Sequence, residues 1–556
     1  MFALIRKVGS PLIPAAAVTV IILMFYGFLT EFGVSTQRAV GMLILAMLAK
    51  VLGRSYDSRS ACAVCALMIL LVNPMQLYQP GFQLSFVAAF GISYFNREWE
   101  QMKLQKGKTP FEKLAFLFLS SLTPQLLTAP VILNSYYELP VYSVFLNIPV
   151  VGLLSAVVFL SILAGAAGVF SYALGRFFVG GVYLVLELYE MLCALTEQLP
   201  FPIWLYGKPQ SIRLIVYFAI IILFFIVAGR IGIHYRHHPR QHFFRRYAFF
   251  VLGLLPLVFF RIPDKDVVRD GNGCVVDFLS IGQGDCAVIR SGSGNAYLID
   301  CGSTTVRSAG EYRMEPWLKY HGIAKLEAVF LSHPDSDHTN GVLEVLEKTN
   351  TPKDWYRGEI QIKNLVLPAA YRTKTLLAQE QTDGNAKGFE NLIQLAEEKE
   401  IPIRWLETGD KVIEETLSFA CLHPGNDYPT EDTNDASMVL LVECEKTAIL
   451  FTGDVGTTGE EKIIRVLNEK AWDKKETVIL KVAHHGSKNS SSMEFLERLQ
   501  PDVAVISCGK DNRFGHPHED TLKRLKSVGS KIVSTPEHGT VTVQVGENVM
   551  IFGYRS

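Results

Sequence analysis

The chain has 556 residues, of which 49% are hydrophobic and 19% are charged, and its formal net charge is −1. One soluble domain seldom grows past about 300 residues around one core, so at least two domains are needed. The charges are unevenly distributed, because residues up to 260 include 19 Lys and Arg against 9 Asp and Glu, and the remainder 34 against 45. Near-neutrality therefore conceals a half of charge +10 and a half of charge −11.

The first half consists almost entirely of apolar stretches with the basic residues in the gaps between them. A helix needs about 20 apolar residues to cross a bilayer, and some of these stretches are shorter. The pattern predicts a polytopic membrane domain over residues 1–260 with about eight to ten crossings, and it excludes an ordinary basic nucleic-acid-binding domain. The stretches are 11–29, 38–53, 60–72, 82–95, 114–134, 141–171, 177–195, 214–233 and 247–260.

The orientation of this domain follows from two basic loops. Residues 96–113 and 230–246 each carry five Lys and Arg, which favours the cytoplasmic side of the membrane. If 247–260 then crosses once more, the rest of the chain emerges on the outer face. We therefore expect a multi-pass protein of the cell membrane with an extracytoplasmic C-terminal domain. An interfacial position for the short stretch 247–260 would reverse that orientation.

The second half, residues 266–556, alternates short strand-like runs with helical patterns. This alternation predicts a layered α/β domain with interleaved helices. The expected strands are 275–281, 287–290, 296–299, 328–332, 438–442, 448–452, 478–482 and 503–507, and the expected helices are 338–348, 388–400, 458–470, 493–500 and 519–528. Gly282, Gly284 and the run 291–295 have the composition of hairpin turns.

Side chains with metal-ligand chemistry follow three of these strands. Loops at neighbouring strand ends tend to gather at one rim of a layered α/β domain. Imidazole and carboxylate groups in such a position predict one shared metal site more readily than an acidic turn with incidental histidines. The candidate ligands are His333, Asp335, Asp337 and His338 after strand 328–332, Asp454 after strand 448–452, and His484 and His485 after strand 478–482.

These motifs resemble those of the metallo-β-lactamase fold, which implies an αββα sandwich. The matching segments are His333-Pro-Asp335-Ser-Asp337-His338, Thr452-Gly-Asp454, His484-His485-Gly-Ser487 and Leu298-Ile-Asp300-Cys-Gly302. More narrowly, Gly282-Gln-Gly-Asp285, Asn434-Asp435-Ala-Ser437 and the membrane segment from Asn73 to Phe86 resemble the ComEC family of DNA-uptake channel proteins. Members of that family usually carry further domains ahead of the channel region, so we expect this chain to lack the N-terminal part.

The resemblance also implies the metal ligands. Asp335 stands where the wider fold has a histidine, and one further ligand histidine has no clear counterpart. Carboxylates in place of imidazoles favour Mn²⁺, or Mg²⁺, over Zn²⁺, and one or two ions are expected. One position would use Asp337, His338, Asp454 and either His484 or His485, and the second would use His333, Asp335 and the shared Asp454.

The activity implied by the resemblance is metal-dependent phosphodiester hydrolysis. The expected catalytic residues are Asp335, Asp337, Asp454 and His485, and the expected substrate-binding residues are Asn434, Ser487, Lys488, His516 and His518. Residues 261–556, with a charge of −11, are a poor partner for phosphates, so the metal ions and local basic clusters would have to compensate.

The whole chain is thus expected to act in natural transformation. The membrane domain would pass single-stranded DNA into the cytoplasm, while the C-terminal nuclease would act on double-stranded DNA and degrade the strand left outside. The expected partners are DNA, the lipid bilayer, a DNA receptor and a cytoplasmic motor. Two alternatives stay open: a membrane-tethered metallo-hydrolase of a small substrate, and an N-terminally truncated component that does not transport.

Overall fold

The computed structural model describes residues 2–7, 9–101, 110–234, 273–349, 360–372, 387–414, 416–469, 474–546 and 548–554. It divides into two compact units, Met1–Arg261 and Ile262–Ser556, which are described separately. The expected crossing 247–260 and most of the basic segment 230–246 lie outside the described residues. The orientation of the C-terminal domain therefore stays a prediction.

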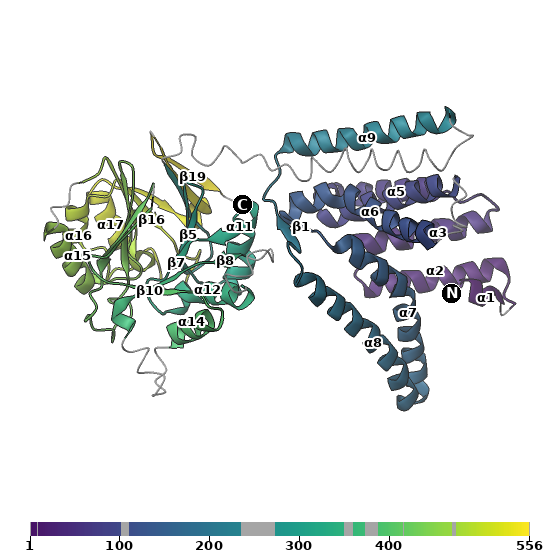
Figure 1. Cartoon of the computed structure of the whole chain (residues 1–556), viewed down its shortest axis with the longest axis horizontal. Coiled ribbons are helices and arrows are strands. Elements are labelled where there is room, and N and C mark those ends of the chain that lie inside the picture. Colours follow the sequence, from purple (N-terminus) through teal and green to yellow (C-terminus); the bar gives the residue numbers. More distant parts are fainter. Residues whose placement is uncertain are drawn as a thin grey trace. The chain divides into compact units, whose positions relative to one another are not determined.

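The N-terminal unit is built from helices (Figure 1). Each apolar stretch expected up to residue 233 lies within one of them or extends past its ends by no more than two residues, and the long stretch 141–171 corresponds to one helix, α7. The helices are α1 (Phe2–Lys7), α2 (Leu12–Leu29), α3 (Val34–Val51), α4 (Ser58–Val72), η1 (Pro74–Tyr78), α5 (Pro80–Gln101), α6 (Pro110–Tyr136), α7 (Ser143–Phe170), α8 (Tyr172–Glu197) and α9 (Ser211–His234), with short strands β1 (Glu138–Pro140) and β2 (Ile203–Leu205).

Four of these helices are long and apolar enough to cross a membrane by length and composition. Among the described residues they are α2, α3, α7 and α8, and shorter apolar segments occur in α4, α5 and α9. Their large apolar side chains are widely exposed, with Phe170 89% and Val169 81% accessible. Such exposure is typical of helices that face lipid.

Polar side chains join the helices of this unit. The Nε of Arg38 in α3 donates to Ser85 Oγ in α5 over 2.7 Å. The hydroxyl of Tyr217 in α9 donates to the carbonyl of Leu126 in α6 over 2.6 Å. Hydrogen bonds of this kind between helices, rather than a strong hydrophobic drive, position helices that pack in an apolar medium.

The C-terminal unit contains two large sheets. The first has eight strands in the order β10-β9-β7-β5-β4-β3-β18-β19, and the second has seven in the order β11-β12-β13-β14-β15-β16-β17. The first comprises β3 (Cys274–Phe278), β4 (Cys286–Ser291), β5 (Ala296–Cys301), β7 (Ala328–Phe330), β9 (Leu365–Pro368), β10 (Ile403–Leu406), β18 (Thr540–Val545) and β19 (Met550–Tyr554). The second comprises β11 (Lys411–Ile413), β12 (Ser418–His423), β13 (Val439–Cys444), β14 (Thr447–Phe451), β15 (Thr477–Lys481), β16 (Val503–Ile506) and β17 (Lys531–Ser534). A separate pair is formed by β6 (Lys325–Leu326) and β8 (Gln361–Ile362).

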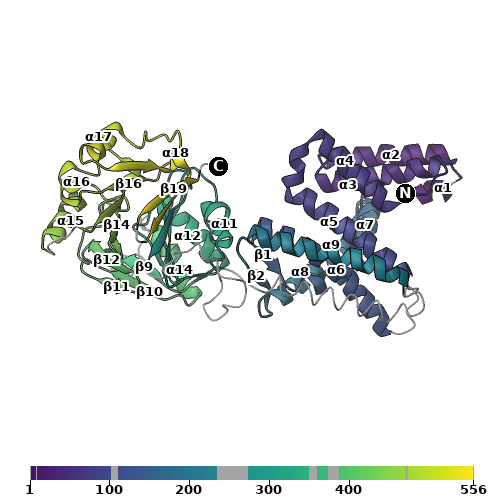
Figure 2. The ribbon, with the colours of Figure 1, turned by 90° about the horizontal axis from the view of Figure 1, so that it is seen from above.

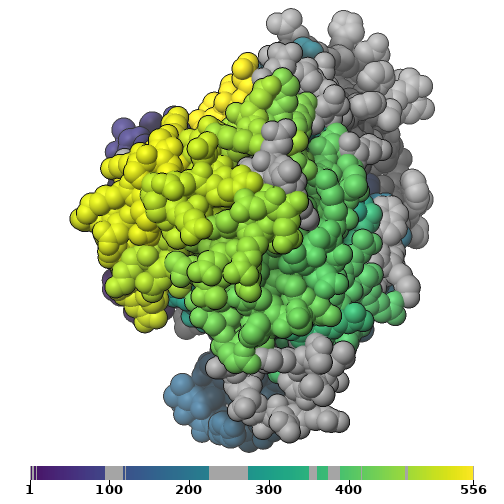
Figure 3. Space-filling view, turned by 90° about the vertical axis from the view of Figure 1, so that its left-hand side faces the viewer, coloured from purple at the N-terminus to yellow at the C-terminus, as the bar shows by residue number. Residues whose placement is uncertain are grey.

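Helices cover both outer faces of the paired sheets (Figures 1 and 2). On one side lie α11 (Glu315–Tyr320), α12 (Ser336–Lys348) and α14 (Lys387–Glu398), and on the other α15 (Thr457–Glu469), α16 (Met493–Leu499) and α17 (Glu519–Ser527). Figure 3 looks onto the second side, where the later part of the chain forms the surface. Short helical turns are η3 (Gly310–Met314), η5 (Ala369–Tyr371), η6 (Ala483–Gly486) and α18 (Thr535–His538). The expected αββα sandwich is confirmed.

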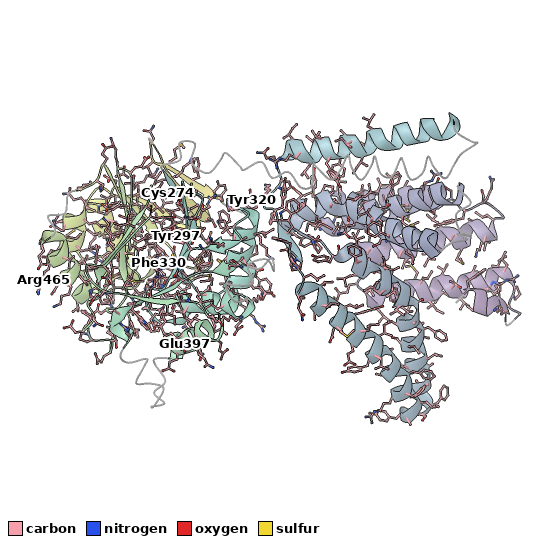
Figure 4. All side chains as sticks on the ribbon, viewed as in Figure 1. Cys274, Tyr297, Tyr320, Phe330, Glu397 and Arg465 are labelled. Carbon is pink, nitrogen blue, oxygen red and sulfur yellow. The ribbon has the colours of Figure 1, made fainter. Side chains whose placement is uncertain are left out.

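The main core lies between the two sheets. Figure 4 places Cys274, Tyr297 and Phe330 there, and Tyr320, Glu397 and Arg465 on the outer helices. Phe330 of β7 stacks on Phe419 of β12 with ring centroids 5.0 Å apart, which joins the sheets directly. Two further cores pack the helices onto the sheets, and all three consist of residues from this unit alone. The unit therefore has the cores it needs to fold independently.

Candidate metal centre

The candidate site lies where the carboxyl ends of strands from both sheets meet. In the second sheet, β14, β15 and β16 are parallel, so the segments that follow them leave the sheet at the same edge. In the first sheet, β5 and β7 are also parallel. The segments after β7, β14 and β15 carry the metal-binding motifs expected from the sequence. This arrangement follows the general rule for the ends of strands in α/β folds.

The first group of ligand atoms comes from the segment after β7 and from Asp454. Helix α12 begins at Ser336, so Asp337 and His338 lie in its first turn. His333 and His338 are buried, with ring centroids 4.1 Å apart, and His338 Nε2 lies 3.2 Å from Asp454 Oδ1. Ligand atoms of His333, His338 and Asp454 all lie within 4.8 Å of one another.

His485 completes the centre from the segment after β15. Its Nε2 lies 3.4 Å from Asp337 Oδ2 and 3.6 Å from Asp454 Oδ2. Its ligand atoms form a second group with those of Asp337 and His338. His484 and His485 have φ angles of 48° and 55°, a left-handed backbone that residues with a side chain seldom adopt. Such strain is typical of functional segments, and in this one the His485 ring is buried and faces the centre.

Two buried carboxylates, Asp285 and Asp300, stand behind the histidines. Asp300 Oδ2 lies 3.0 Å from His338 Nδ1 and accepts a hydrogen bond from the Ser332 hydroxyl. Asp285 Oδ1 lies 3.3 Å from His485 Nδ1, which is also 3.0 Å from the Ser507 carbonyl oxygen. Because Nδ1 of His338 and of His485 has a partner here, the Nε2 atoms of both rings are directed toward the centre, as in many metal sites.

Gly284 allows this close packing beside Asp285. Its φ is +150°, and a Cβ atom there would lie 2.0 Å from the carbonyl oxygen of Gly302 and 2.7 Å from that of Asp337. Any side chain at position 284 would therefore push apart the backbone segments that carry Asp285 and Asp337. Gly284, the second glycine of the Gly282-Gln-Gly-Asp285 motif, is therefore required because no side chain fits at its position.

The charges of the centre are strongly coupled. Burial lowers the pKa of His485, but the carboxylates of Asp454 and Asp285 outweigh it and raise that pKa to about 10. Burial raises the pKa of Asp454, but His485 and His338 hold it well below its usual value. The carboxylates are therefore ionised and strongly favour positive charge beside them, whether it comes from protons or from a cation.

The buried ligand atoms fit a divalent cation. Among the described residues, four inward-facing ligand atoms are buried without a hydrogen-bond partner, namely His333 Nε2, His338 Nε2, His485 Nε2 and Asp454 Oδ1. An unsatisfied buried polar atom costs about 1–3 kcal/mol, so four of them together favour a common partner. A divalent ion bound by imidazole nitrogen and carboxylate oxygen atoms would satisfy them.

Asp335 and His484 stand at the edge of the centre. The side chain of Asp335 is 45% exposed, accepts a hydrogen bond from Thr433 Oγ1, and lies 3.8 Å from His333 Nε2. That of His484 is 32% exposed, with its Nε2 3.8 Å from Asp454 Oδ2. Neither joins a ligand group among the residues that the structure describes. The ligand group that contains His333 and Asp454 includes His338 and not Asp335. Of the two neighbouring histidines, His485 and not His484 belongs to a ligand group.

The expected substrate-binding residues differ in their positions. The ring of His516 lies 5.6 Å from that of His484 and 6.4 Å from that of His485, at the edge of the centre. Asn434 lies next to Thr433 and has a buried, unpartnered Oδ1. Ser487 is buried, and its carbonyl oxygen accepts a hydrogen bond from Thr521 Oγ1. His518 caps the start of α17, because its Nδ1 accepts a hydrogen bond from the Asp520 amide. Lys488 is exposed.

Three buried charged residues at the centre were not among the expected ligands, namely Asp285, Asp300 and Lys481. Lys481 Nζ donates to Asp285 Oδ2 and to the Val482 carbonyl. Asp300 and Lys481 each stand at or near the end of an otherwise apolar strand. A charged residue in a fully buried strand is rare unless paired, and that is the signal by which the sequence could have identified them.

The position of Asp300 leads to a prediction for metal affinity. Asp300→Asn should lower the affinity of the C-terminal domain for Mn²⁺ or Zn²⁺ by about 10–100-fold, because the amide orients His338 less firmly. Isothermal titration calorimetry measures this directly. Asp277→Asn, which alters another buried aspartate in the same sheet, paired with Arg290, is the control and should leave the affinity unchanged. Equal losses in both variants would contradict the role assigned to Asp300.

Comparison with known proteins identifies both domains. Residues 279–510 match the family model of the metallo-beta-lactamase superfamily, and residues 1–230 match that of competence proteins. The C-terminal domain is therefore a metallo-β-lactamase domain and the N-terminal one a competence-protein domain. The chain is 27% identical to ComE operon protein 3 of Bacillus subtilis over 99% of its own length, and its resemblance to the ComEC family is confirmed.

The chain spans only part of the length of its curated relatives. It covers 66% of ComE operon protein 3. Half of its own length matches 33% of the competence protein ComA of Neisseria gonorrhoeae, with 27% identity. Among solved structures, CmlA, a diiron beta-hydroxylase from Streptomyces venezuelae, is similar with a TM-score of 0.31 and 12% identity. That similarity covers 49% of this chain and 54% of CmlA.

Proposed function

We propose that this chain acts in DNA uptake at the cell membrane and that its C-terminal domain hydrolyses phosphodiester bonds of DNA. The observation that carries the proposal is a buried cluster of metal ligands in the same chain as a competence-protein domain. The relatives named for competence support the biological role. The apolar helices support a membrane location.

The residues of the centre have distinct parts in the proposed hydrolysis. His333, Asp337, His338, Asp454 and His485 would hold one or two divalent ions. Such an ion supplies Lewis acidity toward a phosphoryl oxygen and lowers the pKa of water, which makes phosphodiester hydrolysis accessible at neutral pH. The segments after β7, β14 and β15 hold the ligand side chains in fixed positions, and burial keeps bulk water from competing for them.

The finer parts of the proposal rest on the sequence. We retain the domain limits 1–260 and 266–556, an outer-face position for the C-terminal domain, and Mn²⁺ as the favoured ion. One strand would enter through the membrane domain while the other is degraded. A DNA receptor and a cytoplasmic motor would be the protein partners.

DNA uptake by cells tests this proposal. Deleting the coding sequence from its source organism should abolish the nuclease-protected, internalised fraction of fluorescently labelled double-stranded DNA, while DNA bound at the surface persists. A plasmid copy of the intact sequence should restore it. Uptake that is unchanged by the deletion would contradict a role in transport, whatever the hydrolytic activity of the C-terminal domain.

A further inference from the structure

One exposed aromatic side chain lies next to the metal centre without an assigned role. Phe514 belongs to the loop between β16 and α17 and is 49% exposed. Its ring stacks beside that of His516, with centroids 5.8 Å apart and an interplanar angle of 25°. The His516 ring in turn lies 6.4 Å from that of His485, which faces the centre. A row of rings therefore leads from the ligand cluster to an exposed face.

The loop that carries this row is held in a defined conformation. Asn512 donates from Nδ2 to the carbonyls of Gly509 and His516, and its Oδ1 accepts from the amides of Phe514 and His516. The Gly509 amide donates to Gln283 Oε1 of the loop after β3, which ties the start of the loop to the first sheet. Exposure of Phe514 is thus a feature of an ordered loop, and exposing its ring to water is unfavourable unless a ligand covers it.

The surroundings of Phe514 fit a nucleotide. The guanidinium carbon of Arg513 lies 4.8 Å from the centre of the Phe514 ring, so a positive charge stands beside the aromatic face. Lys510 of the same loop is also exposed. Aromatic faces flanked by basic groups bind single-stranded nucleic acids, because every base has a face that can stack and every phosphate has a charge.

The negative charge of the C-terminal half favours a contact that does not depend on phosphate. The second half of the chain carries −11, so it has little general attraction for a polyanion. Stacking of a base on an aromatic ring does not depend on the charge of the phosphate, so it can contribute to binding even on an acidic domain. Bases inside a duplex are already stacked on both faces, which leaves unpaired nucleotides as the ligand.

We propose that Phe514, with Arg513 and His516, forms a stacking site for an unpaired base of a DNA strand whose neighbouring phosphodiester bond lies at the metal centre. The proposal rests on the proposed function, because it specifies the substrate of that same centre. Under this proposal the C-terminal domain binds single-stranded DNA, without preference for a base sequence.

Binding of two strands that differ in their bases tests the proposal. The full chain, purified in detergent without added divalent metal so that no cleavage occurs, is titrated into fluorescein-labelled dT12 and into a 12-residue abasic strand with the same phosphates. We expect wild type to bind dT12 at least about tenfold more tightly than the abasic strand, and Phe514→Ala and Phe514→Leu to remove most of that difference. Phe514→Trp should preserve it.

Phe552→Ala is the matched control, because Phe552 is 42% exposed on the edge strand β19. It should leave the ratio of the two affinities unchanged. Equal affinity of wild type for both strands, or an unchanged ratio in Phe514→Ala, would overturn the stacking site even if the chain cleaves DNA. A preference for dT12 that depends on Phe514, without cleavage of either strand when Mn²⁺ is added, would instead support the stacking site and count against the nuclease.

Discussion

Asp454→Asn is expected to abolish metal binding and all metal-dependent activity of the C-terminal domain. The Asp454 carboxylate lies near the Nε2 atoms of two inward-facing histidines, 3.2 Å from His338 Nε2 and 3.6 Å from His485 Nε2. Losing an orienting residue behind a ligand costs about 10–100-fold in metal affinity. Asp454 forms one ligand group with His333 and His338 and another with Asp285 and His485, so losing it should cost more than about 100-fold. Calorimetric titration with Mn²⁺ measures the affinity, and release of labelled nucleotides measures the activity.

The control for this variant is Asp427→Asn, an exposed aspartate of the loop after β12. It should match wild type in affinity and activity, and circular dichroism should show that both variants are folded. Full metal affinity in Asp454→Asn would mean that the ligand cluster is not the metal site. Retained cleavage with lost metal binding would mean that the hydrolysis belongs to another site.

Lys481→Met should have the largest effect on stability. Lys481 and Asp285 form an ion pair whose side chains are 4% and 7% exposed. Burial raises the pKa of Asp285, but Lys481 and His485 hold it well below its usual value, so the carboxylate is ionised. Removing one partner of a buried pair leaves an uncompensated charge and costs about 3–5 kcal/mol. Urea denaturation of the C-terminal domain measures this loss as a lower midpoint.

An exposed pair provides the comparison. Lys446 lies 2.7 Å from Glu476, but the two side chains are 74% and 67% exposed, so Lys446→Met should cost less than about 1 kcal/mol. The double variant Lys481→Met with Asp285→Asn should recover part of the stability, because no buried charge is then left unpaired. A loss below 1 kcal/mol in Lys481→Met would show that the pair is accessible to water in solution.

The hydrophobic pattern predicted most of the elements that position the centre. The expected strands 328–332, 448–452 and 478–482 correspond to β7, β14 and β15 within two residues at each end, and the expected helix 338–348 lies within α12. These strands are mostly apolar, although β15 ends in Lys481, and they are followed by polar loops, so both their type and their ends are marked in the sequence. The ligand motifs follow them directly and could be placed for the same reason.

Other parts of the sheets carry weaker patterns. Strands β10 and β11 are short and partly exposed, so their alternation of apolar and polar residues covers too few positions to be distinctive. The pattern also missed β18, which joins the eight-stranded sheet beside β3 although the two strands are more than 260 residues apart. Pairing between such distant segments is set by tertiary packing, which no local pattern encodes.

The roles of individual side chains depended on geometry that the sequence does not contain. The sequence left the choice between His484 and His485 open because both follow β15. In the structure the His485 side chain is buried with its Nε2 3.4 Å from Asp337 Oδ2, whereas the His484 side chain is 32% exposed. Asp335 and Asp337 are two residues apart, yet the start of α12 places Asp337 beside His485 and leaves Asp335 half-exposed. Asp285, directly before β4, and Asp300, in β5, come from earlier parts of the chain, and only the closed sandwich brings them behind the histidines.

Cleavage of DNA by the purified protein tests the central claim most directly. The full chain in detergent and its residues 266–556 are incubated with labelled single-stranded and double-stranded DNA and Mn²⁺, Mg²⁺ or Zn²⁺, beside Asp454→Asn and Asp337→Asn proteins prepared identically. We expect cleavage that requires a divalent ion, is fastest with Mn²⁺ and is lost in both variants. A folded wild-type protein that binds the metal but cleaves no DNA would contradict the account and favour a hydrolase of a small substrate.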